Sequence, residues 1–428
     1  MFAINTTLIS IVFILLGLAY LLALAFLVIV HRRDSASEGE ATDHVFSIIV
    51  PAHNEAAVIG ATLDSILAMD YPPEKCEVLV VDDGSDDETG AIVSRVAAMW
   101  QNRVQVLSVP KAMSARGKSS ALNNGFAFLL ENSKFRGSKD WIVGVFDADG
   151  RPSRNLMKKA SFQFRKRSVG GVQASVRIAN RKASLLTRMQ DVEFAGFTRV
   201  TQMMRMRLAG SVSLGGNGQF VRVSALEDVA IDGAHGLYWN PRSLTEDLDL
   251  TVRLSLRNWD MRHLDTACVD QEGVEHLKPL LRQRTRWAWG SLQVFSEYVV
   301  HLKILRAPGV QLRKRLDMLL VLSLFLVSPM VMVTWILSGL ALVGVIRVVT
   351  TLPQPALFLL SFAYLPFVAY GMLTIRRYER IRLPFDLVVF AVYTYHWVPC
   401  MCAGIWRLVT RRDPVWWKTK RAVEPVAG

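Results

Sequence analysis

Apolar runs near both ends of the chain most constrain its fold, because about twenty apolar residues are enough to cross a bilayer as a helix. The first run, Leu8–Val30, is almost uninterrupted and is followed at once by His31, Arg32 and Arg33. Basic residues flank membrane spans on the cytoplasmic side, so we expect Met1 outside and Arg33 inside. A cleaved signal peptide fits less well, since the run is too long, no positive charge precedes it and no small-residue cleavage site closes it.

Three more apolar runs, Met318–Val345, Phe358–Leu373 and Phe385–Leu408, lie near the other end. With 51% hydrophobic and 20% charged residues, the chain is too apolar for an ordinary soluble enzyme and too charged for a protein of spans alone. We therefore expect a multi-pass protein of the cell membrane with a large cytoplasmic part. The predicted parts are a transmembrane anchor (1–31), a cytoplasmic domain (32–275), interfacial amphipathic helices (276–317), C-terminal transmembrane helices (318–410) and a basic tail (411–428).

The basic tail conflicts with this number of spans. One crossing before the polar stretch and three after it would place Arg411–Arg421 outside, against the positive-inside rule. Either Phe385–Leu408 is interfacial or re-entrant, or the tail breaks the rule. The sequence leaves both alternatives open.

The formal net charge of +13 invites comparison with nucleic-acid-binding proteins. Many basic residues, however, flank the apolar runs, as in Arg313–Arg315 and Arg407–Arg421, where cytoplasmic orientation and anionic lipid head groups explain them better. We therefore expect a membrane partner and no nucleic acid. The four cysteines form no Cys-x-x-Cys pair, so neither a disulfide framework nor a zinc site is indicated.

Strand-like and helix-like segments alternate from Phe46 onward, which indicates an α/β fold with a mostly parallel sheet wrapped by helices. The expected strands are Phe46–Val50, Glu77–Val81, Val104–Val109 and Trp141–Phe146, and the expected helices are Ala57–Ala68, Asp87–Met99, Lys118–Glu131, Ser153–Arg165 and, further on, Ala183–Leu208. In open sheets of this kind, ligands bind at the carboxyl ends of the strands. No strand is followed by G-x-G-x-x-G or by G-x-x-x-x-G-K-[ST], so neither a dinucleotide site nor a P-loop is supported.

Two carboxylates follow the fourth of these strands. Asp147 and Asp149 are separated by one residue, and the chain turns at Gly150, so both side chains can reach one point. Hard carboxylate oxygens at such a turn suit Mg²⁺ or Mn²⁺, which would take its other ligands from water and a substrate diphosphate. The alternative is a pair of aspartates that cap the turn.

A second acidic segment opens a later helix. In Thr245-Glu246-Asp247, the threonine can cap the helix, and Asp247 lies in its first turn, where the helix dipole favours the ionised form. An ionised carboxylate beside a metal–diphosphate site can serve as the general base for an attacking hydroxyl. Ordinary helix capping explains the same pattern without catalysis.

Arginine and tryptophan combine in the stretch LLRQRTRWAWG, residues 280–290. Arg284 and Arg286 can bind phosphate, and Trp287 offers a flat face on which a sugar can stack. The alternative is an amphipathic helix on the membrane, with arginines at the head groups and tryptophans at the interface. The two interpretations are compatible, and Arg282, Arg284 and Trp289 are candidates for the lipid-facing or structural side.

Taken in order, these motifs resemble those of the membrane-embedded family 2 glycosyltransferases, which include cellulose, hyaluronan and poly-N-acetylglucosamine synthases and some glycolipid synthases. The similarity spans about Ser47 to Gly290. It rests on Pro51-Ala-His-Asn-Glu55, Asp82-Asp83-Gly84-Ser85, Gly117-Lys118, Asp147-Ala-Asp149, Thr245-Glu246-Asp247 and Gln283-Arg-Thr-Arg286-Trp287. The resemblance implies a GT-A type nucleotide-sugar domain in the cytoplasmic part.

The resemblance also implies roles for single residues. Uridine would be recognised by Pro51, Glu55, Asp82 and Asp83, and the donor would also contact Lys118 and Asp147. The metal would be held by Asp147 and Asp149, and catalysis would fall to Asp247 with Glu246. The diphosphate and the acceptor would contact Gln283, Arg286 and Trp287. The implied activity is that of an inverting hexosyltransferase that depends on a UDP-sugar and on Mg²⁺ or Mn²⁺. Such an enzyme would extend a β-linked polysaccharide processively at the membrane, with export of the product as an added role.

The acceptor stays open at this point. Gly215–Gln219 departs from the acceptor segment of many polysaccharide synthases, and residues 271–290 are at least as similar to bacterial diacylglycerol glucosyltransferases. A glycolipid synthase that transfers glucose from UDP-glucose to diacylglycerol is therefore the main alternative, and a non-catalytic sugar-nucleotide-binding subunit is a minor one. The small number of spans leaves a homo-oligomer or an accessory export subunit open, and hexose selectivity cannot be derived from motif spacing.

Overall fold

The computed structural model describes residues 39–410 apart from 102, 112–113, 115–116, 232–236, 350–355, 357–358 and 376–377. Of the first 38 residues it describes 2–5, 7, 11, 14–15, 17–19, 22 and 25–26. Most of the predicted anchor, Leu8–Val30, and the whole basic tail, 411–428, therefore lie outside the described residues.

An eight-stranded sheet forms the centre of the described structure, with the strand order β4-β3-β2-β5-β8-β7-β9-β6. Its strands are β2 (Val45–Ala52), β3 (Cys76–Asp82), β4 (Val104–Ser108), β5 (Trp141–Val145), β6 (Arg151–Pro152), β7 (Val169–Ile178), β8 (Gln219–Arg222) and β9 (Asp260–Gln271). The first four in this order, β4, β3, β2 and β5, are mutually parallel, and β8 runs antiparallel to both of its neighbours. The four predicted strands and the mostly parallel sheet are thus confirmed.

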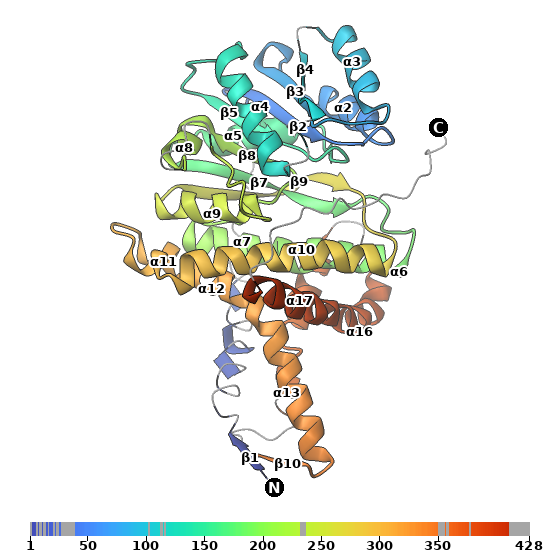
Figure 1. The fold of residues 1–428 in the computed structure, drawn as a ribbon, viewed down its shortest axis with the longest axis vertical. Coiled ribbons are helices and arrows are strands. Elements are labelled where there is room, and N and C mark those ends of the chain that lie inside the picture. The colour runs from blue at the N-terminus through green and yellow to red at the C-terminus, as the bar shows by residue number, and fades with distance from the viewer. Residues whose placement is uncertain are drawn as a thin grey trace.

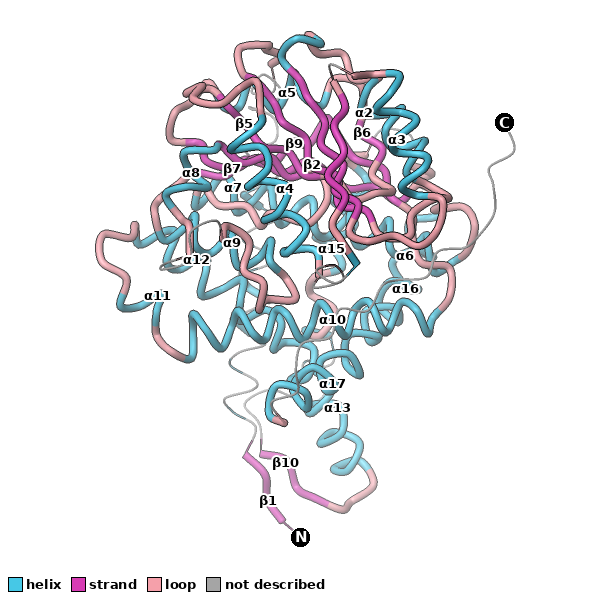
Figure 2. The backbone as a smooth tube through the Cα atoms, turned by 45° about the horizontal axis from the view of Figure 1, so that its top comes forward, coloured by secondary structure: helices cyan, strands magenta, loops and turns pink. Residues whose placement is uncertain are grey.

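Helices cover both faces of this sheet, as Figures 1 and 2 show. Successive residues of β2 point to opposite faces, so Ile48 packs with one helical layer and Ile49 with the other. The helices on the Ile48 face are α2 (Ile59–Leu67), α3 (Thr89–Met99) and α5 (Leu156–Phe164), and those on the Ile49 face include α4 (Lys118–Asn132), α8 (Val223–Asp228) and α9 (Glu246–Leu256). Burial on both faces explains why β3 is apolar along almost its whole length.

A second helical layer lies under the sheet in Figure 1. It contains α6 (Leu185–Asp191), η3 (Val192–Thr198), α7 (Arg199–Ala209), α10 (Leu277–Phe295), η4 (Ser296–Val300), α11 (Lys303–Arg306) and α12 (Leu312–Ser323). The helix predicted at Ala183–Leu208 is present, but its middle, η3, is π-helical. A buried ion pair between Arg205 of α7 and Asp317 of α12, at 2.8 Å, lies within this layer. A second pair, Arg188 with Asp386 at 2.7 Å, joins the layer to a later helix.

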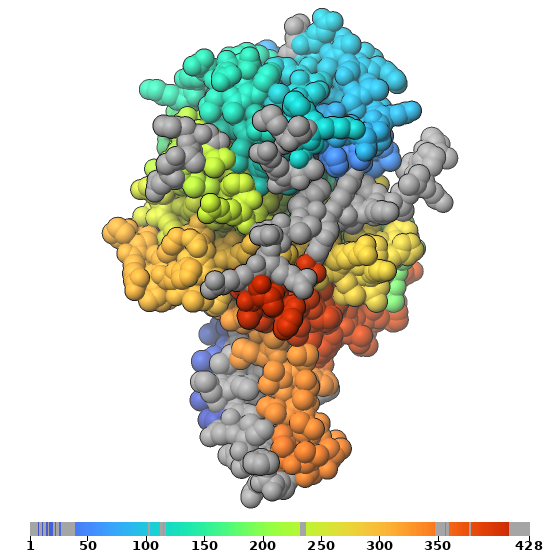
Figure 3. All heavy atoms as spheres, viewed as in Figure 1, coloured from blue at the N-terminus to red at the C-terminus, as the bar shows by residue number. Residues whose placement is uncertain are grey.

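The last helices run in two directions. They are η5 (Leu324–Leu326), α13 (Val327–Leu342), α15 (Leu365–Leu373), η6 (Arg380–Arg382), α16 (Leu383–Tyr393), η7 (Thr394–His396) and α17 (Trp397–Val409). α13 projects away from the sheet and ends near β10 (Ile346–Val349), which pairs with β1 (Phe2–Asn5); Figure 3 shows α13 in orange as part of a narrow column. α16 and α17 instead lie across the underside of α10, where Cys400 and Met401 pack against Ala288.

Among the described residues, one helix, Arg380–Val409, is long and apolar enough to cross a membrane. The pair Leu312–Leu326 and Pro329–Leu342, bent by 43°, counts as a second if it forms one broken span. The run Phe358–Leu373 contains the nine-residue helix α15, about 14 Å long, which packs through Val368 and Met372 against η3. The described residues therefore do not support the multi-pass arrangement that the hydropathy pattern predicts.

Candidate active site

Four of the predicted donor-binding residues gather where β2 and β3 end. The two strands are parallel neighbours, which brings Pro51 and Asp82 to the same edge of the sheet. Asp82 and Asp83 are buried, and Asp82 Oδ1 accepts a hydrogen bond from the Ser85 backbone N–H at 3.1 Å. Glu55 follows in the loop after β2. The expected grouping at the carboxyl ends of the strands is present.

The loops after β2 and β3 are joined by hydrogen bonds. The backbone N–H of Asn54 donates to Ser85 Oγ at 3.0 Å, and that of Glu55 donates to Thr89 Oγ1 at 2.7 Å. Asn54 Oδ1 in turn accepts from the Asp86 backbone N–H at 2.9 Å, while Asn54 itself has a φ of 55°. Asparagine is one of the few residues with a side chain that adopts this conformation readily. The two loops thus form one unit that holds Glu55 beside the aspartates.

Lys118 begins α4 and connects the strand ends to the glycine-rich loop. Its ammonium pairs with the Asp147 carboxylate and donates to the Gly216 carbonyl oxygen at 2.5 Å. Burial by itself lowers the pKa of Lys118, but the charges of Asp147 and Glu246 outweigh burial and raise it. The site therefore holds a fixed cation next to the β5 turn.

Gly216 lies between this lysine and the candidate base. A Cβ built on Gly216 would lie 2.6 Å from Lys118 Nζ and 3.5 Å from Asp247 Oδ2. Asn217, the next residue, accepts a hydrogen bond from the Asp147 backbone N–H at 3.2 Å through Oδ1. The glycine-rich loop, noted in the sequence only as a departure from the family pattern, thus brings Lys118, Asp147 and Asp247 to one place.

The predicted metal ligands lie at the turn after β5. The Asp147 side chain is 36% exposed, whereas Asp149 is buried and accepts a hydrogen bond from the Glu272 backbone N–H at 3.2 Å. Among the residues that the structure describes, no group of three or more His, Cys, Asp or Glu side chains is arranged to hold a metal ion. Two carboxylates still suit Mg²⁺, which usually keeps several waters and takes phosphate oxygens from its substrate. The ammonium of Lys118 on Asp147 shows that this position attracts a cation.

The two carboxyl groups that open α9 have raised pKa values. Burial, and then the charge of Asp247, raise the pKa of Glu246 to about 7. Burial also raises the pKa of Asp247, although Lys118 acts in the opposite direction. The sequence argument considered only the helix dipole, which favours the ionised form, and the structure corrects it because burial outweighs that effect.

Thr245 does not cap α9 as predicted. Its side chain makes no capping hydrogen bond, and Oγ1 is buried without a hydrogen-bond partner. Instead, Thr245 packs against Gly290 of α10, where a Cβ would lie 2.7 Å from Thr245 Cγ2. Close packing against α10 therefore takes the place of a cap.

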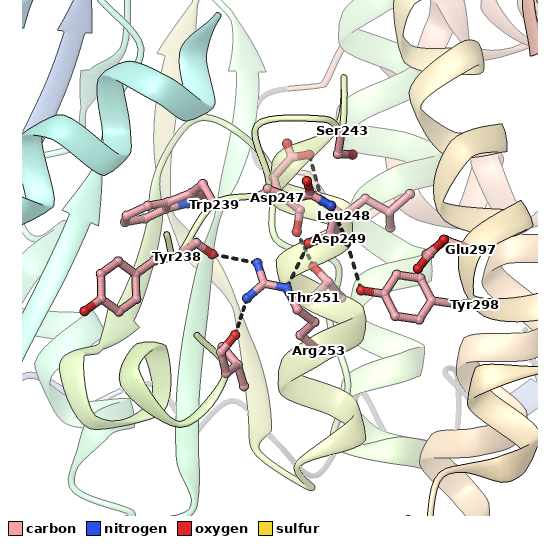
Figure 4. Close-up of polar contacts among 12 residues, drawn as sticks. Tyr238, Trp239, Ser243, Asp247, Leu248, Asp249, Thr251, Arg253, Glu297 and Tyr298 are labelled. Carbon is pink, nitrogen blue, oxygen red and sulfur yellow. Dashed lines mark hydrogen bonds and ion pairs between the residues drawn. The ribbon is translucent and has the colours of Figure 1, made fainter. Parts of the chain in front are cut away.

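A buried network around Asp249 holds α9 in position, as Figure 4 shows. Asp249 accepts hydrogen bonds from Arg253 Nε at 2.8 Å and from the Tyr298 hydroxyl at 2.9 Å. Arg253 also donates to the Tyr238 carbonyl oxygen at 2.6 Å. Two residues after Asp249, Thr251 Oγ1 donates to the Asp247 carbonyl oxygen at 2.9 Å. The network fixes the helix end that carries Asp247.

Arg286 is the residue of α10 that faces the acidic groups. Burial lowers the pKa of Arg286, and the charges of Glu246, Asp147 and Asp247 oppose that effect. Its guanidinium, which stays charged in proteins, therefore lies in the field of all three carboxyl groups. Gln283 is partly exposed on the same helix. Among Gln283, Arg286 and Trp287, Arg286 is thus the residue that the structure connects to the candidate base.

Trp287 lies against a buried ion pair. Arg284 pairs with Glu193 of η3 at 2.8 Å, and its guanidinium carbon is 4.0 Å from the centroid of the Trp287 ring. Glu193 also accepts hydrogen bonds from the Tyr393 hydroxyl at 2.9 Å and from Trp397 Nε1 at 3.2 Å. Arg284 is therefore structural and not lipid-facing. Trp289 is likewise buried, whereas Arg282 is exposed.

Sequence reasoning missed Glu193, Asn217 and Asp249. Glu193 could have been noticed as an acidic residue inside an otherwise amphipathic helical pattern, and Asp249 as the third acidic residue of the first turn of α9. Neither signal shows which distant side chain is the partner, because Glu193 lies 91 residues from Arg284 in the chain.

Comparisons with known proteins identify a matching family. Residues 43–290 match the family described as glycosyltransferase-like family 2. A β-monoglucosyldiacylglycerol synthase of Synechocystis sp. is 36% identical over 252 residues, which are 59% of this chain and 48% of that protein. The chain thus spans about half the length of this relative. A second β-monoglucosyldiacylglycerol synthase, from Trichormus variabilis, is 30% identical over 411 residues, 94% of this chain and 82% of that protein.

A solved structure shares the fold. A mannosyltransferase from Pyrobaculum calidifontis, determined with GDP-Man and Mn²⁺, superimposes with a TM-score of 0.60 at 19% identity. The match covers 91% of this chain and 98% of that one. It confirms the predicted GT-A type fold.

Proposed function

The chain belongs to glycosyltransferase family 2, and on that basis we propose that it transfers glucose from UDP-glucose to diacylglycerol with inversion at the anomeric carbon. The family resemblance found in the motifs is confirmed, whereas the donor and the acceptor are proposals. The names of the two relatives support the lipid acceptor over a polysaccharide acceptor.

The observation that carries the transferase chemistry is the convergence of Lys118, Asp147 and Asp247 on Gly216. Asp247 would accept the proton of the acceptor hydroxyl, and its raised pKa suits a base that works near neutral pH. The hydroxyl oxygen would then form a bond to the anomeric carbon while the bond from that carbon to the diphosphate oxygen breaks. UDP leaves with the electron pair, and an α-linked donor gives a β-linked product.

Two cations would offset charge on the departing diphosphate. Lys118 lies at the β5 turn, and Arg286 lies in the field of the carboxyl groups of Glu246, Asp147 and Asp247. Charge held in a fixed position stabilises a developing anion without reorganisation during the reaction. Asp147 and Asp149 would hold Mg²⁺ or Mn²⁺, which would supply further positive charge to the diphosphate.

The uridine end of the donor would lie at the edge formed by Pro51, Glu55, Asp82 and Asp83. This proposal is supported by the joined loops after β2 and β3, which connect that edge to the rest of the site. Gln283 and Trp287 would lie on the acceptor side. Because Arg284 covers one face of the Trp287 ring, only the rest of the indole is left for an acceptor.

The packing of the last helices under α10 supports a location of the protein at the cytoplasmic face of the membrane. α16 and α17 lie across α10, and α17 also contacts α13. The packing of α17 against α10 favours the interfacial alternative for Phe385–Leu408. The basic tail would then stay on the cytoplasmic side, in agreement with the positive-inside rule.

Labelled UDP-glucose and diacylglycerol, incubated with the purified full chain, test the proposal. We expect label in a single chloroform-soluble glucolipid, with a β-linkage by NMR. Label that appears only in a polymeric product would overturn the lipid acceptor and favour polysaccharide synthesis. UDP-galactose and UDP-N-acetylglucosamine, used in parallel, test the choice of sugar.

A further inference from the structure

An apolar pocket of about 350 Å³ opens where α6, α10 and α16 meet the start of α17. Its lining includes Leu186, Leu277, Leu280, Leu281, Val392 and Tyr393. The pocket is not lined by any of the candidate donor-binding, metal-binding or base residues. The size is at the lower end of the range for ligand pockets in proteins.

The pocket adjoins the RTRW motif along α10. Leu281 lines the pocket and Trp287 follows six residues later, about 9 Å along the helix axis at 1.5 Å per residue. The wall on this side is Tyr393, whose hydroxyl donates to Glu193. Glu193 holds Arg284, and Arg284 lies on Trp287. A series of buried contacts, from Tyr393 through Glu193 and Arg284, thus connects the pocket wall to the ring of Trp287.

The mouth of the pocket is apolar as well. Leu277 is 57% exposed and Val392 is 70% exposed. Val392 continues an exposed stripe of α16 that includes Val388 and Phe385, at the spacing of one helix face. Burying such an exposed apolar surface against other apolar groups is favourable, because it removes the surface from water.

Exposed cations lie close to this mouth. Lys278 and Arg282 are one turn apart on α10, and both are exposed. Cations beside an apolar surface suit the boundary of a membrane, where lipid head groups are anionic and acyl chains lie just beneath. The surroundings thus point to a lipid and not to a water-soluble molecule.

We propose that this pocket binds a fatty acyl chain of the lipid acceptor, whose glycerol end would extend along α10 toward Trp287. This inference rests on the proposed transfer to a lipid. A sugar is a poor occupant, because its hydroxyl groups would lose water and find few partners among leucine and valine side chains. A pocket of about 350 Å³ with an apolar mouth accommodates part of one acyl chain.

Paired tryptophan variants of the full chain test the pocket. Val392→Trp fills its mouth, whereas Val388→Trp places the same side chain one turn earlier, at a position of equal exposure that does not line the pocket. Both variants are assayed with UDP-glucose in phosphatidylglycerol vesicles that contain dioleoylglycerol, and with dihexanoylglycerol in solution. We expect Val392→Trp to raise the KM for dioleoylglycerol about tenfold and to leave the KM for dihexanoylglycerol and for UDP-glucose unchanged. Val388→Trp should behave as the unchanged protein does. An equal rise of the KM for dioleoylglycerol in both variants, or no rise in either, would refute acyl-chain binding in this pocket.

A diacylglycerol with a diazirine in the middle of one acyl chain gives a second readout that needs no turnover. We expect light-induced attachment to residues 277–281 or 392–399, and its loss in Val392→Trp. Attachment without glucolipid formation would keep the acyl site and refute the proposed function. Glucolipid formation with attachment elsewhere would keep the function and refute the acyl site.

Discussion

Arg284 of α10 and Glu193 of η3 form an ion pair with an Nη2–Oε2 distance of 2.8 Å, and the arginine side chain is only 1% exposed. Because Arg284 also lies on the ring of Trp287, this pair joins the π-helical segment to the motif that would hold the acceptor. The motif is thus positioned by a buried charge pair within the protein and does not need lipid head groups to order it.

Replacement of one partner tests this role. Glu193→Ala leaves Arg284 buried without its counter-charge, and we expect a loss of about 3–5 kcal/mol in the free energy of unfolding. Thermal unfolding of the full chain in detergent measures the change. As a control, Glu297→Ala removes an exposed pair with Lys303 and should cost less than about 1 kcal/mol. Similar unfolding temperatures for the two variants would contradict the role of Glu193.

Replacing Asp247 or Asp249, the two aspartates at the start of α9, should have different effects, the first on the rate and the second on stability. Asp247→Asn removes the proposed base, so we expect kcat to fall about 10²- to 10⁴-fold while UDP-glucose binding and folding persist. Asp249→Asn instead weakens the network with Arg253 and Tyr298, and we expect mainly a lower unfolding temperature. Initial rates and calorimetry on both variants separate the two effects. An Asp247→Asn protein with unchanged kcat would remove this residue as the base.

The strand-end part of the site could be predicted from the sequence because parallel strands end at one edge of a sheet. Asp82 and Asp147 follow apolar strands directly, so topology alone brings them to the same edge. The contacts that complete the site could not be predicted. Lys118 and Gly216 lie 98 residues apart in the chain, and their meeting depends on where β8 inserts into the sheet.

Hydropathy identified the apolar segments correctly, but it did not show which of them are buried helices and which are membrane spans. Phe358–Leu373 has the composition of a span, yet α15 uses its apolar side chains to pack on η3, and Gly371 lies so close to Gly196 that no Cβ would fit. A buried helix and a membrane helix expose the same residue types to apolar surroundings, so composition cannot separate them. Only the packing partner distinguishes the two.

Gly216→Ala should disturb the donor site without unfolding the chain. Its new Cβ would displace the flexible end of Lys118, 2.6 Å away, from Asp147 and from the carbonyl oxygen of residue 216. Loss of a charged hydrogen bond costs about 1.5–3 kcal/mol, so we expect the KM for UDP-glucose to rise about 10- to 100-fold. Kinetics with varied donor concentration measure this effect. The control Gly137→Ala, at an exposed position with φ of +81° before the start of β5, should lower stability through backbone strain but leave the KM unchanged.

Glu246 should make stability depend on pH. Burial, and then the charge of Asp247, raise its pKa from the ordinary value of 4.5 to about 7 on folding, so the folded chain binds the proton more tightly than the unfolded chain does. The stability that this protonation provides is present below pH 4.5 and is lost as the pH rises toward 7, up to about 3 kcal/mol at 1.36 kcal/mol per pKa unit. Glu246→Gln should remove this decline and be more stable than the unchanged chain at pH 8. Unfolding temperatures between pH 5 and 8 measure it, and equal slopes for the two proteins would contradict the assignment.

Metal removal tests the proposed role of Asp147 and Asp149. The two side chains lie at one turn, and Lys118 is the cation on Asp147 in the described structure. Without a divalent ion, Lys118 and Arg286 are the cations that the described part of the site offers to the diphosphate. We therefore expect a chelator to reduce glucosyl transfer at least tenfold and Mg²⁺ or Mn²⁺ to restore it. Asp149→Asn should raise the metal concentration needed for half-maximal rate, whereas Asp140→Asn, at an exposed surface pair with Arg167, should not. Full activity after chelation, with no metal detected by elemental analysis, would show that the lysine and the arginine suffice.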